Sequence, residues 1–161
     1  MPKQAYHHGN LPAALVAAAI DLLAEHGPEG VAVREAARRA GVSPGAPYKH
    51  FDDRAALLAA VAAEGARRIT DAMDRAAAQA GDDAARPRSR GIAYVAFAAA
   101  HPALFRVMYA PAHAAGVADA LAGWELPERC RVHGLARLFV DGHLAGNTPA
   151  DVERIAASVL T

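Results

Sequence analysis

Very small, aromatic and basic side chains follow one another over the short segment that begins at Ser43. Gly45 and Ala46 are small enough to let a backbone approach the edge of a duplex closely, and the Ala46 methyl group can meet a thymine methyl group. The side chains behind them are polar or aromatic, namely Tyr48, Lys49 and His50. This order of residue types suits a helix tip that enters the major groove of DNA.

Two short helices joined by a tight turn are predicted to carry these side chains. The first runs from about Val33 to Ala40, and Gly41 ends it because glycine adopts a positive φ there without a Cβ clash. Ser43 is expected to cap the second helix by accepting a hydrogen bond from a first-turn amide. Pro44 is tolerated at the first helical position, so the second helix begins there. The pattern is typical of a helix-turn-helix.

Pro47 stands at the fourth position of this second helix and removes one backbone hydrogen bond, the first-turn bond to Ser43. The cost should be below the roughly 3 kcal/mol of an interior proline. We therefore expect Pro47 to shorten or tighten the helix rather than abolish it, and its ring can also meet an apolar base edge. Since residues 45–47 carry no hydrogen-bonding side chain, base reading would rest on Lys49, on apolar contacts and on DNA shape.

The segment resembles the amino-terminal DNA-binding domain of the TetR family of bacterial transcriptional regulators. The resemblance covers about Tyr6 to Gly65 and rests on the pattern A-G-V-S-x-G-x-x-Y-x-H-F, followed by a basic residue that opens a long helix. The matching residues are Ala40, Gly41, Val42, Ser43, Gly45, Tyr48, His50, Phe51 and Arg54. Pro47 departs from the family pattern, so the resemblance does not indicate which bases are read.

The resemblance implies that Tyr48 turns its hydroxyl toward a phosphate and that Arg54 binds one. A cation at a helix N-terminus opposes the helix dipole, so something other than local helix stability must favour Arg54 there. The plainer interpretations are a half-buried aromatic at Tyr48 and a merely solvated Lys49, while Phe51 is expected in the core. The candidate DNA contacts are Arg34, Ser43, Gly45, Ala46, Pro47, Tyr48, Lys49, His50 and Arg54.

The charges of the chain balance, with 17 Lys and Arg against 17 Asp and Glu. This balance argues against a protein that coats nucleic acid non-specifically. Residues 1–65 are not basic either, so DNA affinity should depend on few phosphate contacts and fall only moderately with salt.

Apolar residues recur at helical spacing along almost the whole chain and no stretch alternates like a strand, so the predicted fold class is all-α. We expect a three-helix helix-turn-helix DNA-binding domain over residues 1–52, a connecting helix over 53–80 and a helical effector-binding and dimerisation domain over 81–161. The first helix should span Leu11 to His26 with Asn10 as its cap, and the connecting helix Asp53 to Gln79.

The second half begins with a predicted linker over Gly81–Arg88, a helix over Ser89–Ala100 and a short helix between Pro102 and Pro111. Further on, V-H-G-L-A-R-L-F-V-D-G from Val132 resembles the W-H-G type of TetR effector domain. That type normally has a tryptophan a few residues earlier, where this chain has Arg-Cys-Arg. The resemblance implies dimerisation through the last two helices, here about Arg129–Leu144 and Pro149–Leu160.

Bulky side chains of this half could line a pocket between helices or simply form its core. The pocket candidates are Tyr94, Phe97, Phe105, Met108, Tyr109, Leu121 and Trp124. Few polar partners accompany them, so a small apolar or aromatic effector is preferred. The predicted anchors of the dimer interface are Val132, Leu135, Leu138, Phe139, Ile155 and Val159.

Other kinds of site are not indicated by the residues. The eight histidines include no pair at i, i+4 and the chain has one cysteine, so we expect no metal ion and no cofactor. No nucleophile, base and oxyanion donor form a recognisable motif, which argues against an enzyme. The chain has no run long enough to span a bilayer, no signal-like apolar start and no partner for Cys130, which favours a cytoplasmic protein.

The sequence thus predicts a TetR-type transcriptional regulator, a ligand-responsive repressor that binds a palindromic operator as a homodimer. The alternative is an architectural or partner-dependent helix-turn-helix protein without a small-molecule pocket. The chain between Gly116 and Arg129 is short compared with the family, and this motivates the alternative.

Overall fold

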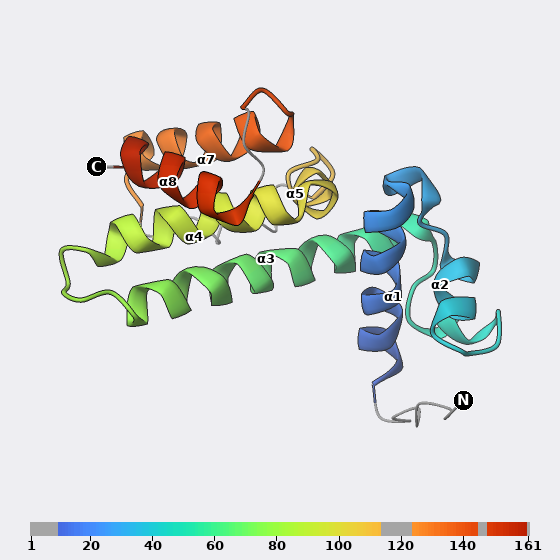
Figure 1. The fold of residues 1–161 in the computed structure, drawn as a ribbon. Helices are drawn as coiled ribbons and strands as arrows, with labels where there is room; N and C mark the ends of the chain where they lie inside the picture. The colour runs from blue at the N-terminus through green and yellow to red at the C-terminus, as the bar shows by residue number, and fades with distance from the viewer. Residues whose placement is uncertain (1–9, 114–123, 145–147, 161) are drawn as a thin grey trace. The chain divides into compact units, whose positions relative to one another are not determined.

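The computed structural model describes residues 10–113, 124–144 and 148–160, and Figure 1 shows the order of their helices. These residues form helices and turns without a strand, which confirms the all-α prediction. The chain divides into two compact units, Met1–Val61 and Ala62–Thr161. The division falls inside the longest helix, α3 (Arg54–Ala78), where the sequence predicted a connecting helix of nearly the same bounds.

Helix α1 (Leu11–His26) has the predicted bounds. The Ala13 amide donates to Asn10 Oδ1 at 3.2 Å, which caps the first turn, and Gly27 ends the helix at φ 71°. The apolar side of α1 forms the core of the first unit together with residues from α2, α3 and the loops. The main core residues are Leu15, Leu22, Leu23, Val31, Ala36, Ala37, Phe51, Leu57 and Val61.

The second unit is built around α4 (Arg86–Ala100), against which α7 (Leu126–Val140) and α8 (Pro149–Val159) pack (Figure 1). Helices α4 and α7 both begin earlier than predicted. The reason is the same in both, since Pro87 and Pro127 occupy first turns, where a missing N–H breaks no helical bond.

Helix α5 (Pro102–Met108) follows α4 after a sharp bend, and its bounds agree with the short helix predicted between two prolines. Within the described residues no single helix has both the length and the apolar character needed to cross a membrane. Helices α4 and α5 have the required length and apolar character only when they are counted as one segment, and that segment is bent by 107°.

Candidate functional site

The first half of the predicted helix-turn-helix is confirmed. Helix α2 spans Val33–Arg39, and Ala36 and Ala37 are completely buried. Gly41 lies at φ 70°, the left-handed conformation that glycine adopts without strain. The Val42 amide then donates to the Ala37 carbonyl at 3.0 Å, which closes the turn.

The second half differs from the prediction. Pro44 and Gly45 form a turn, and Ala46–Lys49 form a single turn of 3-10 helix, η2. The Ala46 amide donates to the Ser43 carbonyl at 3.0 Å, and the amides of His50 and Phe51 both donate to the Pro47 carbonyl at 2.9 Å. An α-helix from Pro44 is therefore wrong. Pro47 supplies no N–H to extend the ladder, which explains the tightening that was expected from it.

This tight turn also changes the roles of Ser43 and Pro47. The main-chain carbonyl of Ser43 takes the place of the predicted side-chain cap, and its hydroxyl makes no capping bond at η2. η2 packs against α1 and α2, and Pro47 is its buried residue. Because its ring lies in the core, we remove Pro47 from the candidate DNA contacts.

The other candidates on this segment lie at the surface. Tyr48 is 44% exposed, and Ser43, Gly45, Lys49 and His50 are exposed as well. Ala46 is half-buried. The turn η2 and the residues beside it thus present one aromatic, one cationic and one imidazole side chain to the outside.

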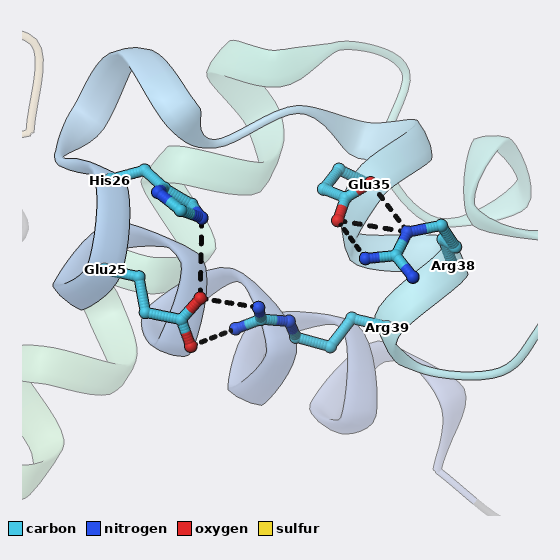
Figure 2. A network of polar contacts seen from close by, with 5 residues as sticks. All are labelled: Glu25, His26, Glu35, Arg38 and Arg39. Atoms are coloured by element: carbon cyan, nitrogen blue, oxygen red, sulfur yellow. Dashed lines mark hydrogen bonds and ion pairs between the residues drawn. The ribbon is translucent and has the colours of Figure 1, made fainter.

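Two of the arginines on α2, Arg38 and Arg39, form ion pairs with glutamates of the chain, as Figure 2 shows. Arg38 donates to Glu35 within α2, with Nε to Oε2 at 2.9 Å. Arg39 joins α2 to α1 through two bonds to Glu25, at 2.8 and 2.6 Å. These hydrogen bonds lower the pKa of both carboxyl groups. Arg38 and Arg39 are therefore already partnered within the chain.

Arg34 and Lys49 differ from these arginines. Both are exposed, and neither forms an ion pair with a residue in the described part of the chain. Arg34 lies in the first turn of α2 and Lys49 ends η2. Each of the two elements of the motif, α2 and η2, therefore carries one exposed cation that can bind an anion of another molecule.

Arg54 has partners that its sequence position did not reveal. Its Nε donates to the Val31 carbonyl at 2.9 Å, and one terminal nitrogen donates to the Pro28 carbonyl at 2.6 Å. These hydrogen bonds stabilise the Arg54 cation at the start of α3, where the helix dipole opposes a positive charge. The acceptors are main-chain carbonyls 23 and 26 residues away, so the sequence pattern could not predict these hydrogen bonds.

Comparison with known proteins identifies this arrangement. Residues 15–61, which include α2, the turn and η2, match the model of the bacterial regulatory proteins of the tetR family. A solved bacterial regulatory protein in the tetR family from Rhodococcus RHA1 is 25% identical, covers 92% of this chain and 94% of its own, and has a TM-score of 0.65. The chain belongs to the TetR family.

Other solved structures extend the likeness over nearly the whole of this TetR-family chain. A protein with unknown function from Rhodococcus sp. RHA1 is 32% identical over 98% of this chain and 97% of its own, with a TM-score of 0.75. A TetR family transcription regulator from Marinobacter aquaeolei VT8 has the same fold at 20% identity, covering 92% of each chain with a TM-score of 0.62. No curated protein matches the chain. The predicted transcriptional regulator with a helix-turn-helix is thereby confirmed at the level of the family.

Several of the predicted pocket residues in the second unit are packed in its core. Tyr94, Phe105 and Met108 are completely buried, and the rings of Tyr94 and Phe105 meet edge to face with centroids 5.7 Å apart. Leu121 lies outside the described residues. The three buried side chains therefore form core, the plainer of the two interpretations.

Trp124 and Phe97 line separate cavities in the described part of this unit. Trp124 lines one of about 350 Å³, and Phe97 lines another of about 320 Å³. The other residues around the Trp124 cavity are Ala84, Pro87, Arg88, Gly91, Glu128, Arg131, Val132 and Leu160. The Phe97 cavity has a polar wall that includes Arg67, Arg68, Arg75 and His101. Only the first combines an aromatic side chain with several apolar ones.

A polar contact joins α4, the residue after α5, and α7 inside the aromatic core. The Tyr94 hydroxyl lies 2.6 Å from the Tyr109 hydroxyl and 2.9 Å from His133 Nδ1. Burial lowers the pKa of His133, and the nearby Arg137 lowers it further. The folded chain therefore favours a neutral imidazole at this position. Gly134 beside it is exposed, and a Cβ atom placed on it would meet nothing within 4 Å among the described residues, so the close approach expected there is not what requires a glycine.

Protonation of His133 should destabilise the second unit. Its pKa is lower in the folded chain than the about 6.5 of an unfolded histidine, so the unfolded chain binds more protons as pH falls through that value. His101 is shifted the same way, chiefly by burial. We expect urea denaturation to give a lower free energy of unfolding at pH 5.5 than at pH 7.5, a range above the titration of the carboxyl groups. His133→Gln should reduce this difference, and an identical pH dependence in the variant would contradict the assignment.

The predicted dimer anchors separate into two groups. Val132, Leu135 and Phe139 are at most 6% exposed and lie in the core of their own chain, where α7 packs against α4. We therefore withdraw these three as interface anchors. Leu138 and Val159 are 43% and 44% exposed, and Ile155 is half-buried, so these three remain candidates.

Proposed function

We propose that this TetR-family chain binds a palindromic DNA operator as a homodimer and represses transcription until a small molecule binds to its second unit. One observation carries the proposal. Arg34 on α2 and Tyr48 and Lys49 on η2 are exposed and without ion pairs to described residues, whereas the neighbouring arginines Arg38 and Arg39 are paired within the chain. A surface of this kind has donors to offer to phosphates and base edges.

The glycine at position 45 also supports the proposal that this surface binds DNA. Its φ is −88°, an ordinary value for any residue, and a Cβ atom placed on it would meet nothing within 4 Å. Neither the conformation nor the packing of this chain requires glycine there, although glycine loses more backbone entropy on folding than other residues. Close approach of an outside partner, such as the edge of a base pair, explains the missing side chain.

Gly45→Ala should separate DNA binding from stability. We expect its free energy of unfolding to stay equal or rise by up to about 1 kcal/mol, because alanine restricts the unfolded chain. Affinity for DNA should fall about tenfold or more, since 1.4 kcal/mol of lost contact suffices for that. Urea denaturation and fluorescence anisotropy measure the two quantities. Gly81→Ala, at another open position, is the control, and parent-like DNA binding by Gly45→Ala would contradict this role.

A homodimer would bring two copies of this surface to one duplex. Two-fold symmetry then requires inverted half-sites, about 34–36 Å or one helical turn apart. The exposed side chains Leu138 on α7 and Val159 on α8 support an interface on the last two helices.

The cavity at Trp124 is the proposed effector site. Its volume of about 350 Å³ and its apolar residues Val132 and Leu160 suit a small apolar or aromatic molecule. Such a ligand relieves repression only if it binds the DNA-incompetent state more tightly than the competent one. A thermal-shift screen distinguishes this from the architectural alternative, because a specific ligand raises the melting temperature.

Selection of bound duplexes from a random DNA library tests the proposed function. Enrichment of one motif with two inverted half-sites supports a sequence-specific dimer. Enrichment of a single half-site contradicts the dimer, and no enrichment contradicts operator recognition altogether.

A further inference from the structure

Arg54 joins the two ends of the helix-turn-helix. Val31 comes just before α2 begins, and Arg54 opens α3 just after the segment that contains η2. The two bonds from the Arg54 guanidinium, to the carbonyls of Pro28 and Val31, therefore close residues 32–53 into a loop held at its base. We call this pair of bonds the Arg54 clasp.

The geometry of the clasp suits arginine in particular. A guanidinium is planar and presents several donors in a fixed fork, so it can bond to two carbonyl oxygens at once, and a charged donor strengthens each bond. Val31 is completely buried, which fixes one of the two acceptors in the core of the first unit. Glu29 adds little, because its carboxylate is 94% exposed and lies 3.8 Å away.

The clasp restricts how the same side chain can contact a phosphate. The clasp uses Nε and one terminal nitrogen of the guanidinium, so turning the whole group toward a phosphate, rather than contacting one through the other terminal nitrogen, would break both bonds and leave the carbonyl of the buried Val31 without this donor. A buried acceptor left unpaired costs about 1–3 kcal/mol. Holding the loop closed, in contrast, costs nothing at the moment of DNA binding, because the clasp is already formed in the free chain.

We infer that Arg54 is a positioning residue for DNA recognition, which holds α2 and η2 so that Arg34 and Lys49 meet the duplex together. The inference rests on the proposed function, and it departs from the phosphate role that the sequence resemblance implied. Arg54 acts here through the segment that it closes and not through its charge.

Arg54→Lys and Arg54→Gln distinguish the two roles on a selected operator. Lysine keeps the charge but has no fork for two carbonyls, so the clasp predicts that both variants lose about tenfold or more in affinity. The dependence of log affinity on log salt should keep its slope, because no phosphate contact is lost. A phosphate role predicts instead that lysine restores parent affinity and that glutamine lowers the slope by about 1.8 per dimer, at about 0.9 for each contact.

Arg39→Gln is the matched control, because it breaks another arginine tie of the first unit, the one to Glu25. All titrations are made at a temperature where circular dichroism shows each variant folded, so a purely stabilising role predicts parent affinity for both. In the free chain, amide exchange over residues 32–53 should quicken in Arg54→Lys while that of α1 does not. Parent affinity in Arg54→Lys overturns the inference alone, whereas a parent chain that binds no duplex overturns the proposed function as well.

Discussion

Replacing both Arg34 and Lys49 by glutamine should abolish measurable operator binding near physiological salt and leave the fold intact. Both side chains are exposed and have no ion pair with described residues, so their removal breaks no tie within the chain. A dimer would lose four phosphate contacts, which lowers the magnitude of the salt slope by about 3.6. Anisotropy titrations of a labelled operator at several salt concentrations measure both effects.

The paired arginines provide the control for this experiment. Arg38→Gln removes a cation from the same helix, but one that is bonded to Glu35, so it should change the salt slope much less. For the parent chain we expect a slope of about −3.6, from about 0.9 for each of four contacts, which is moderate for a DNA-binding protein. A double variant with the parent slope would show that the phosphate contacts lie elsewhere.

Leu138→Glu combined with Val159→Glu should convert the dimer into monomers and reduce operator affinity by more than 100-fold. The two side chains are 43% and 44% exposed, so a monomer tolerates carboxylates there. In an interface between two copies the same carboxylates would be buried against the partner, and a buried charge that is unpaired or faces a like charge costs several kcal/mol. Sedimentation equilibrium measures the mass, and operator titration measures the affinity.

Ala78→Glu serves as the control, because it adds a carboxylate at an exposed position at the end of α3. It should leave both mass and affinity unchanged. A double variant of Leu138 and Val159 that sediments as a dimer would place the interface on another surface.

Local chemistry explains which parts of the site were predictable. Asn10, Gly27 and Gly41 fix the ends of α1 and α2 through bonds and backbone angles within a few residues, so the sequence predicted these bounds closely. Pro47 was also informative, since a missing N–H tightens its element wherever the rest of the chain lies. The extent of that change, a single 3-10 turn with Pro47 buried, was not predictable from the local sequence, because η2 also packs against α1 and α2.

Long-range packing explains what could not be predicted. The acceptors of Arg54 are main-chain carbonyls, which every residue has, so no pattern of side chains announces them. On α7, helical spacing shows that Leu135 and Leu138 are apolar but not which of them faces the chain's own core. The positions of α4 and α5, which both pack against α7, leave Leu135 buried and Leu138 exposed.

The central claim is that Arg34 and the segment from Ser43 to His50 form the DNA-binding surface. Its most direct test is a nuclear magnetic resonance titration of the isotope-labelled chain with the selected operator duplex. We expect the largest amide shifts in the first unit on Arg34 and on residues 43–50, with smaller changes near the paired Arg38 and Arg39. Shifts concentrated on other surfaces, with Gly45, Tyr48 and Lys49 unmoved, would contradict the claim.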